Sequence, residues 1–182
     1  MLDCCKDVVG VCCFLYDLFR RKPKALVVGL KGSGKITFLL QQSFQGRGID
    51  NVPDGGGAAS LHALQFRFVS FSLEKTKDIA LRKKLCQGTS YLIVVVDSTE
   101  RKKLPRLRNE LCALLHLEEL SHVPILIYAN KQDQPRCVPK EEILQTLALP
   151  TSHHWHIQPC SFHTREGLDR GCEWLLSKPS RG

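Results

Sequence analysis

The sequence predicts an α/β domain built on a mostly parallel, six-stranded, doubly wound sheet with flanking helices. Its 182 residues suffice for one full hydrophobic core and are too few for two ordinary domains. Short β-branched runs alternate along the chain with helical patterns, and this alternation requires right-handed crossovers between parallel strands. In such a sheet ligands bind beyond the carboxyl ends of the strands, so functional motifs should directly follow strands.

The elements are placed by their hydrophobic periodicity. Strands are expected where apolar, β-branched residues run together, and helices where apolar residues recur with a period near 3.6. Residues 46–59 contain many glycines together with Pro53, and they predict no regular element. The strands that can be placed cover residues 24–29, 65–71, 91–96, 123–128 and 155–159. The predicted helices cover residues 36–44, 74–85, 104–118, 139–147 and 167–176.

The chain is expected to consist of an N-terminal segment over residues 1–22, one domain over residues 23–178 and a tail over residues 179–182. Residues 2–19 predict an amphipathic helix, because most polar residues share one sector of a helical projection and most apolar residues lie opposite. A basic run and Pro23 end this segment. No stretch of eighteen apolar residues occurs, so we expect no membrane-spanning helix.

The formal net charge of +8 points to an acidic partner, such as anionic lipid or nucleic acid. No nucleic-acid-binding signature accompanies the basic residues, and stacking aromatic residues are not interleaved with them. We therefore expect no nucleic acid as a partner, and we interpret the two basic clusters inside the domain as solvated helix faces. The clusters of the chain are Arg20-Arg21-Lys22 with Lys24, Arg82-Lys83-Lys84 and Arg101-Lys102-Lys103.

The cysteines and histidines predict neither a disulfide framework nor a metal site in the domain. The nine cysteines are odd in number, and the first twenty residues lack the features of a secretory signal peptide, so we expect a reducing cytosol and free thiols. Four of them lie close together, at Cys4, Cys5, Cys12 and Cys13. The histidines that cluster in the sequence, expected in surface or strand positions, are His153, His154, His156 and His163.

A glycine-rich motif, Gly29-Leu-Lys-Gly-Ser-Gly-Lys35, lies between a predicted strand and a predicted helix. This Gly-x-x-x-x-Gly-Lys pattern indicates a phosphate-binding loop, and the alternative is a glycine-rich turn with a surface lysine. Glycines let backbone N–H groups turn toward phosphates, the helix N-terminus adds a favourable dipole, and the lysine would bridge the β- and γ-phosphates. The residues expected at the phosphates are Gly29, Lys31, Gly32, Ser33, Gly34, Lys35, Ile36 and Thr37.

The residue after the motif lysine is unusual for a catalytic site. The pattern requires Ser or Thr there, whose hydroxyl ligates Mg²⁺, and Ile36 has no ligating atom. Thr37 follows one position later and would point about 100° away around the helix. We therefore do not expect tightly held Mg²⁺, and the candidate ligands that remain are Thr37 and Asp54.

A second motif, Asn130-Lys-Gln-Asp133, directly follows a predicted strand. The Asp133 carboxylate can accept hydrogen bonds from guanine N1–H and N2–H₂, a pair of donors that adenine does not offer. Such charge-assisted bonds contribute about 1.5–3 kcal/mol each and would select the base. The loop over residues 160–163 follows the last strand, and its backbone N–H groups are candidates to contact guanine O6. The residues expected at the base are Asn130, Lys131, Asp133, Ser161 and Phe162.

Together these motifs resemble the Arf/Arf-like (ADP-ribosylation-factor-like) branch of the small GTPases. Residues 94–101 are similar to the family's Val-Val-Asp-Ser-x-Asp-Arg segment, and residues 129–133 to its Ala-Asn-Lys-Gln-Asp. The resemblance implies a P-loop small-GTPase fold that binds GTP or GDP, and it runs from about Lys24 to Leu176. The C-terminal strand and helix of the family are matched by Trp155–Gln158, Glu166–Leu168 and Glu173–Leu175.

The chain departs from the family where the family carries its catalytic groups. The first switch, Pro-Thr-x-Gly, corresponds to Pro53–Gly57, where Asp54 stands in place of the threonine that reaches Mg²⁺ and the γ-phosphate. The second switch, Asp-Val-Gly-Gly-Gln, corresponds to Phe71–Lys75, and its Asp, its γ-phosphate-sensing Gly and its Gln are all replaced. Nucleotide binding therefore carries over by resemblance and catalysis does not, with Glu74 as the one candidate to position a water molecule.

The resemblance also implies an N-terminal amphipathic helix at a membrane. The family's myristoylated glycine is replaced by Leu2, which excludes N-myristoylation. The four N-terminal cysteines are instead candidates for palmitoylation, beside a basic run that would face anionic headgroups. One alternative is a helix packed on the domain with incidental thiols. Another is a Zn²⁺ site, which adjacent cysteines on one helix disfavour.

We expect an Arf-like guanine-nucleotide-binding protein, cytoplasmic, monomeric and peripheral to membranes. It would regulate membrane or vesicle trafficking with weak or absent GTP hydrolysis, through protein effectors that the sequence does not identify. One alternative is a pseudo-GTPase scaffold that binds partners without nucleotide switching. Another is an adenylate-using P-loop enzyme, which Asp133 and the lack of a lid or second substrate domain disfavour.

Overall fold

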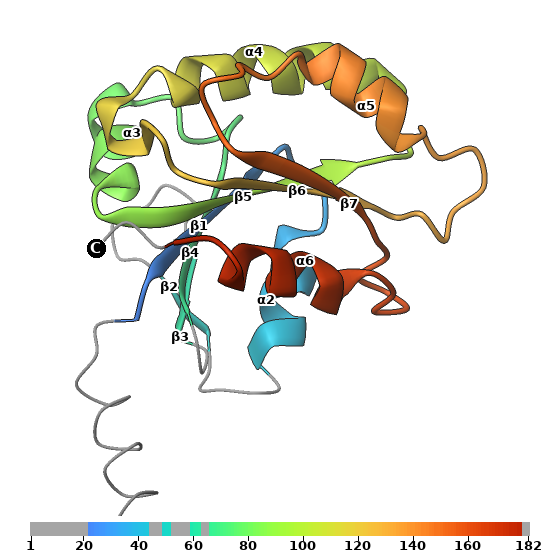
Figure 1. The fold of residues 1–182 in the computed structure, drawn as a ribbon, viewed down its shortest axis with the longest axis horizontal. Helices are drawn as coiled ribbons and strands as arrows, with labels where there is room; N and C mark the ends of the chain where they lie inside the picture. Colours follow the sequence, from blue (N-terminus) through green and yellow to red (C-terminus); the bar gives the residue numbers. More distant parts are fainter. Residues whose placement is uncertain (1–21, 44–48, 52–58, 63–65, 180–182) are drawn as a thin grey trace, which may run out of the picture.

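A seven-stranded sheet runs through the centre of the protein in the computed structural model, which describes residues 22–43, 49–51, 59–62 and 66–179 (Figure 1). The strand order is β2-β3-β4-β1-β5-β6-β7. Strands β4, β1, β5, β6 and β7 pair in parallel, and β2 and β3 add antiparallel pairings at one edge. The strands are β1 Lys24–Gly29, β2 Ile49–Asn51, β3 Ala59–His62, β4 Arg67–Ser72, β5 Thr89–Asp97, β6 Ile125–Asn130 and β7 Trp155–Pro159.

Helices cover both faces of the sheet. Helices α3, α4 and α5 lie on one face, and α2 and α6 lie on the other (Figure 1). Two 3₁₀ turns, η1 Arg101–Lys103 and η2 Glu118–Leu120, flank α4. The helices are α2 Lys35–Ser43, α3 Ile79–Cys86, α4 Leu104–Leu115, α5 Lys140–Leu147 and α6 Leu168–Leu176.

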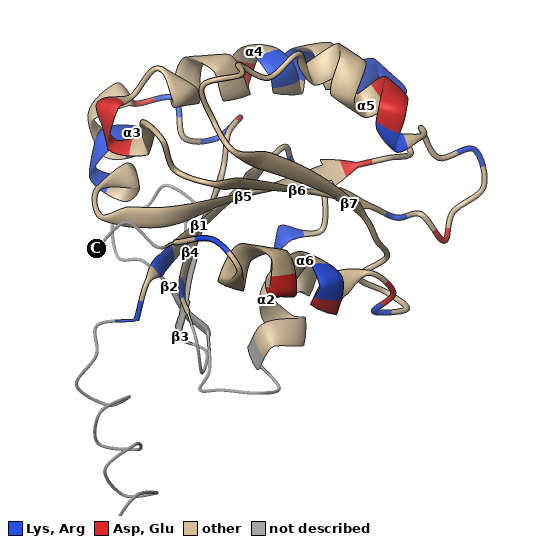
Figure 2. Cartoon of the chain, viewed as in Figure 1, with Lys and Arg blue, Asp and Glu red and all other residues tan. Residues whose placement is uncertain are grey.

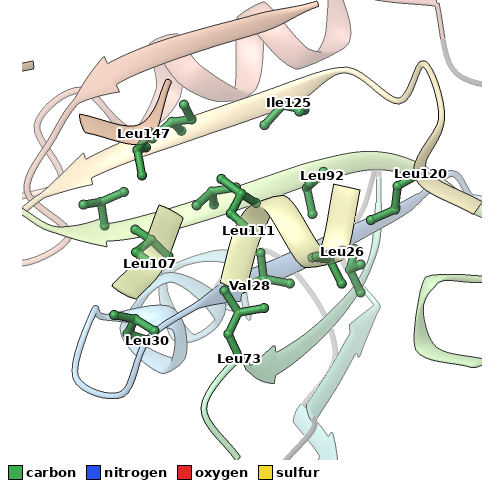
Figure 3. Close-up of a cluster of buried hydrophobic side chains, with 14 of the residues drawn as sticks. Leu26, Val28, Leu30, Leu73, Leu92, Leu107, Leu111, Leu120, Ile125 and Leu147 are labelled. Atoms are coloured by element: carbon green, nitrogen blue, oxygen red, sulfur yellow. The ribbon is translucent and has the colours of Figure 1, made fainter. Parts of the chain in front are cut away.

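The core consists of two hydrophobic clusters, one on each side of the sheet. Because successive strand residues point to opposite faces, β1 contributes Leu26 and Val28 to one cluster and Ala25 and Val27 to the other. Helices α3, α4 and α5 close the first cluster, part of which is drawn in Figure 3, and α2 and α6 close the second. Strand β1 is therefore buried on both faces, which is typical of a central strand in a parallel sheet.

The predicted fold class is confirmed: the sheet is mostly parallel and helices flank both of its faces. The predicted number of strands is wrong: we expected six, and the sheet formed by the described residues has seven. Strand β2 lies within residues 46–59, for which the glycine-rich composition predicted no regular element. It is three residues long and pairs with β3, so long-range pairing places a strand where local composition does not.

Two predicted helices have different bounds in the structure. The helix expected over residues 74–85 begins only at Ile79, because the Asp78 carboxylate caps it by accepting the Ala80 N–H at 2.8 Å. Residues 73–75 form a turn, and residues 76–78 have no regular secondary structure. The helix expected over residues 104–118 ends at Leu115, and the separate turn η2 follows.

Basic and acidic residues are interspersed along the outer helices (Figure 2), but two residues of the basic clusters are buried. Lys24 donates to two backbone carbonyls at the end of α3, at 2.5 and 2.7 Å, and burial lowers the pKa of its amine to about 8. Arg82 pairs with Glu110 at 2.6 Å. The interpretation of the second cluster as a solvated face is therefore wrong for Arg82. It is confirmed for Arg101-Lys102-Lys103, which are all exposed.

Several predictions concern residues outside the described ranges. These include the N-terminal helix, the tail beyond residue 179 and the first-switch counterpart with Asp54, so they stay predictions. The same holds for Cys4, Cys5, Cys12 and Cys13. Within the described ranges no helix has the length and apolar character needed to cross a bilayer. The cysteines in those ranges are free thiols, at Cys86, Cys112, Cys137, Cys160 and Cys172.

Candidate functional site

Three loops meet at one edge of the sheet, beyond the carboxyl ends of its parallel strands. The glycine-rich loop follows β1, the Asn-Lys-Gln-Asp loop follows β6, and the loop that leads into α6 follows β7. Because β1, β5, β6 and β7 run in parallel, their carboxyl ends lie together at this edge. The structure therefore brings the two predicted loops together, with β5 ending between them.

The side chain of Asn130 joins the three loops. Its Nδ2 donates to the carbonyl of Ser33 in the glycine-rich loop at 2.8 Å. Its Oδ1 accepts the backbone N–H of Phe162, in the loop after β7, at 2.9 Å. The amide is buried, and both of its ends have partners, as a buried polar group requires. Asn130 therefore fixes the relative positions of the loops rather than reaching out for a ligand.

The glycines of the first loop leave room for a close approach of backbone groups. A Cβ atom at Gly34 would collide with the Nδ2 atom of Asn130, and Gly34 also has a φ of 103°, in the left-handed region that favours glycine. Gly32 has a φ of 83°, with no atom within 4 Å of a Cβ there. Left-handed residues in a turn direct successive N–H groups into one concavity, which is a cradle for anions. The loop therefore fits a phosphate group.

Lys35 begins α2 and lies over the glycine-rich loop. Its Nζ donates to the carbonyls of Gly29 and Leu30 at 3.0 and 2.7 Å. Burial lowers the pKa of this amine to about 8, although the nearby Glu74 carboxylate acts in the opposite direction. A cation held against the glycine-rich loop fits the β- and γ-phosphates of a nucleotide, as the motif predicts.

The loop after β6 contains a charged pair that the sequence analysis did not single out. Lys131 forms a hydrogen-bonded ion pair with Asp97, the last residue of β5. Asp97 also accepts the N–H and the hydroxyl of Thr99, at 3.0 and 2.6 Å. Burial alone would raise the pKa of Asp97, but the bonds from Lys131 and Thr99 outweigh it and lower the pKa below its usual value. In the sequence, Asp97 directly follows the strand predicted over residues 91–96, and this position could have indicated a functional role.

Asp133 is exposed on the same loop, and its carboxylate is ionised. Hydrogen bonds from the Ser161 hydroxyl and from the Gln134 amide, the latter at 3.0 Å, lower the pKa of Asp133. The loop after β7 therefore reaches Asp133 through Ser161. The arrangement supplies an accessible carboxylate with acceptor capacity left for two N–H donors of a planar base.

The loop after β7 offers fewer backbone donors than expected. The N–H groups of Cys160, Ser161 and Phe162 donate within the protein, to Ala129 O, Glu166 O and Asn130 Oδ1 respectively. Two of these acceptors, Ala129 and Asn130, lie on β6, so the bonds tie the loop to the neighbouring strand. The contact of this loop with guanine O6 stays a prediction. The Phe162 ring lies in the core at 5.4 Å from Phe38, so this residue contributes through its backbone.

The residues at the motif's metal positions do not fit Mg²⁺. The Ile36 side chain is 55% exposed and carries no ligating atom, and Thr37 beside it is exposed. Phe71, which replaces the aspartate of the second switch, is fully buried in the core. Hard cations bind oxygen ligands, and neither Ile36 nor Phe71 supplies one. Asp54, the other candidate ligand, lies outside the described residues.

The second-switch counterpart packs against the glycine-rich loop. The N–H of Leu73 donates to Gly29 O at 3.3 Å, and the Glu74 carboxylate accepts the Lys31 N–H at 2.9 Å. The other oxygen of Glu74 pairs with Arg106 of α4 at 2.8 Å. Both carboxylate oxygens are thus engaged by protein groups. From the sequence, Glu74 was a candidate only to position a water molecule, and nothing in the sequence pattern indicated its pairing with Arg106.

Three of the four histidines lie in surface or strand positions, as expected, and His153 does not. His154 and His163 are exposed, and His156 on β7 stacks on Trp174 with ring centroids 5.2 Å apart. His153 is half-buried, with its ring near the Leu120 carbonyl at 3.2 Å.

Comparisons with known proteins find one family and several similar chains. The sequence model of the ADP-ribosylation factor family matches residues 13–179. The chain is 35% identical over 168 residues to ADP-ribosylation factor-like protein 5A from Homo sapiens and from Rattus norvegicus, an overlap of 90% of this chain and 94% of each relative. It is 30% identical over 176 residues to ADP-ribosylation factor F from Dictyostelium discoideum, with 91% of each chain covered.

The pKa of Lys35 predicts a pH dependence of nucleotide binding. Phosphate oxygens favour the charged amine, so the pKa of about 8 in the protein rises in the complex, and binding near pH 8 takes up a proton. The affinity for GDP should be constant below about pH 8 and fall as the pH rises above it. Calorimetric titration at several pH values, in two buffers of different ionisation enthalpy, measures both effects.

The matched control is Lys35→Arg, whose guanidinium stays charged over this range, so its affinity should vary less with pH. Equal pH dependence in the wild type and this variant would contradict the assignment of the proton to Lys35.

Proposed function

Because the chain belongs to the ADP-ribosylation factor family of small GTPases and is a GTP-binding protein of the Arf-like type, we propose that its three joined loops hold the guanine nucleotide. The observation that carries this proposal is the Asn130 side chain, which ties the glycine-rich loop to the loop after β7. Asn130 gives the two halves of the site, one for phosphate and one for base, a fixed separation. A rigid separation of this kind lowers the entropy cost of binding a two-part ligand.

The residues have distinct roles in the proposed complex. The amides of the glycine-rich loop and the Lys35 ammonium would bind the phosphates. The Asp133 carboxylate would accept from both donors of the guanine edge, held in place by Ser161. An adenylate-using enzyme, the alternative considered from the sequence, is disfavoured because the family implies guanine-nucleotide binding.

We further propose that GTP hydrolysis is weak or absent. Hydrolysis requires a group that neutralises developing charge and a group that orients water. Ile36 offers no oxygen, and Phe71 is buried where the family has its metal-side aspartate. Glu74 could replace the catalytic glutamine only by giving up its bonds to Lys31 and Arg106.

A second candidate function is a scaffold that binds partners without nucleotide switching. It is favoured by the bonds that hold the second-switch counterpart. Arg82 donates to the carbonyls of Leu73 and Thr76, and Leu73 in turn donates to Gly29. A segment anchored at several points resists the rearrangement that a switch needs.

The chain is also proposed to regulate trafficking at a membrane surface, through its N-terminal segment. Acyl chains on two or more of the N-terminal cysteines, next to the basic run before Pro23, would supply the two signals that stable anchoring requires.

Guanine selectivity is tested with Asp133→Asn. Loss of a charge-assisted bond of about 1.5–3 kcal/mol should weaken GDP binding by about tenfold to a hundredfold. Xanthosine diphosphate, which presents a carbonyl in place of the amino group, should bind the variant better than GDP does. Asp169→Asn on α6 is the control, because Asp169 is also exposed and carries the same charge. Wild-type protein that binds ATP as tightly as GTP would show the base assignment to be wrong.

Weak hydrolysis is tested with Ile36→Thr, which introduces a hydroxyl at an exposed position of α2. Wild-type protein and the Ile36→Val control should bind GTP similarly in Mg²⁺ and in EDTA. They should release no measurable phosphate in a single turnover, since ordinary small GTPases alone hydrolyse at only about 10⁻⁴ per second. The threonine variant should bind GTP more tightly in Mg²⁺ than in EDTA. Mg²⁺-dependent release by the wild type, abolished in Lys35→Ala, would contradict the proposal.

Membrane attachment is tested by replacing Cys4, Cys5, Cys12 and Cys13 with serine. The variant should move from the membrane fraction to the soluble fraction of cells, because the acyl chains are lost. A hydroxylamine-based thioester assay should detect acyl groups on the wild type only. Cys112→Ser, on α4, is the control and should leave the distribution unchanged. An unchanged distribution of the quadruple variant would refute palmitoylation as the anchor.

A further inference from the structure

Glu74 places a negative charge on the phosphate-binding loop itself. Its Oε2 accepts the Lys31 N–H at 2.9 Å, and this N–H belongs to the glycine-rich loop. Its Oε1 pairs with Arg106 at 2.8 Å. The Glu74 side chain is only 18% exposed, whereas that of Arg106 is 56% exposed. The carboxylate is therefore the inner member of the pair, and it lies against the loop.

The same carboxylate acts on Lys35. Among the influences on the pKa of Lys35, burial is the largest and lowers it, and the charge of Glu74 is the next and raises it. Glu74 is thus close enough to Lys35 to stabilise its charged form. The lysine that the motif offers to the β- and γ-phosphates, and one N–H of the loop, therefore already interact with a protein anion.

The backbone around Glu74 is held in place. Leu73 donates its N–H to Gly29 O at 3.3 Å, and its carbonyl accepts from Arg82 at 2.7 Å. Lys75 and Thr76 donate their N–H groups to Ser72 O at 3.1 and 3.0 Å. Moving the carboxylate away from the loop therefore requires breaking the Arg106 pair or distorting a turn that is bonded at several points.

We propose that Glu74 makes this a diphosphate site, in which its carboxylate excludes the third phosphate of GTP. The inference rests on the proposed guanine-nucleotide site. The loop amides cradle the α- and β-phosphates, and the lysine reaches the β- and γ-phosphates. A γ-phosphate must therefore share Lys35 with Glu74 and lie beside a like charge. GDP brings no such group, and it leaves the bonds of Glu74 to Lys31 and Arg106 intact.

Arg106 modulates this exclusion. Its guanidinium neutralises part of the Glu74 charge from the solvent side and holds the side chain in its position. Without Arg106, the Glu74 carboxylate would lie next to the loop and its negative charge would no longer be partly neutralised. The discrimination against GTP should then increase.

The experiment measures the Kd values of GTP and GDP by competition against a fluorescent guanine nucleotide, with and without Mg²⁺. Wild-type protein should bind GDP at least about tenfold more tightly than GTP, because like charges placed together in a binding site are strongly unfavourable. In Glu74→Gln the ratio should fall toward one, mainly through tighter GTP binding. The control, Glu141→Gln on the exposed surface of α5, makes the same change in net charge and should keep the wild-type ratio.

The GDP affinity of Glu74→Gln, measured on the same sample, reports whether the loop is still folded. If that affinity is lost, Glu74→Asp serves in its place, because it keeps the charge but withdraws it by one methylene, and its ratio should be intermediate. A wild-type GTP to GDP ratio near one, or an unchanged ratio in Glu74→Gln, would overturn the inference and leave the guanine-nucleotide site intact. Wild-type protein that binds neither nucleotide would overturn the proposed function as well.

Discussion

The buried amide of Asn130 is the interaction on which the rest of the site depends. Parallel strands bring three loops to one edge of the sheet, but a sheet does not by itself fix how loops lie relative to one another. Asn130 does so with one donor and one acceptor, toward Ser33 and Phe162. The same amide excludes any side chain at Gly34, whose Cβ would collide with it. The glycine in the phosphate loop is thus required by a residue of the base loop, and the two motifs form one structural unit.

The glycine-rich loop is held on its other side by the second-switch counterpart. Leu73 donates its N–H to Gly29 O, and the Glu74 carboxylate accepts the N–H of Lys31. Arg82 in turn bonds to Leu73, and Arg106 pairs with Glu74. In a switching protein, contacts of this kind form with the γ-phosphate and are released after hydrolysis. Here the protein supplies the anion. A loop bonded to protein on both sides has less freedom to respond to the number of phosphates that it holds.

The sequence predicted the fold and the two loops because their signals are local. A buried strand, a glycine-rich turn and a helix are each visible within about ten residues. The burial of Lys24 was not predictable in this way, since its partner Leu85 is 61 residues distant along the chain. The role of Glu74 depends on Lys31, 43 residues away, and on Arg106 of α4. Its position in the motif was visible in the sequence, but its partners were not. The bonds of the amides after β7 were not predictable either, because two of their acceptors, Ala129 and Asn130, lie on β6 and are distant in the sequence.

In the proposed function nucleotide binding persists without hydrolysis, and the packing of the protein explains how the two can separate. The groups proposed to bind nucleotide also stabilise the fold: Asn130 joins three loops, Lys35 closes the turn after β1, and the Phe162 backbone anchors the loop before α6. Replacing any of them would cost stability even without a ligand, since buried polar groups would lose their partners. The positions at which the family carries metal ligands have other roles here. Ile36 faces solvent, and Phe71 contributes to the core. A nucleotide that binds and is never hydrolysed would still stabilise the folded chain, by about 2.7 kcal/mol at a hundred times its Kd. Under the proposed function the nucleotide is therefore kept as part of the fold.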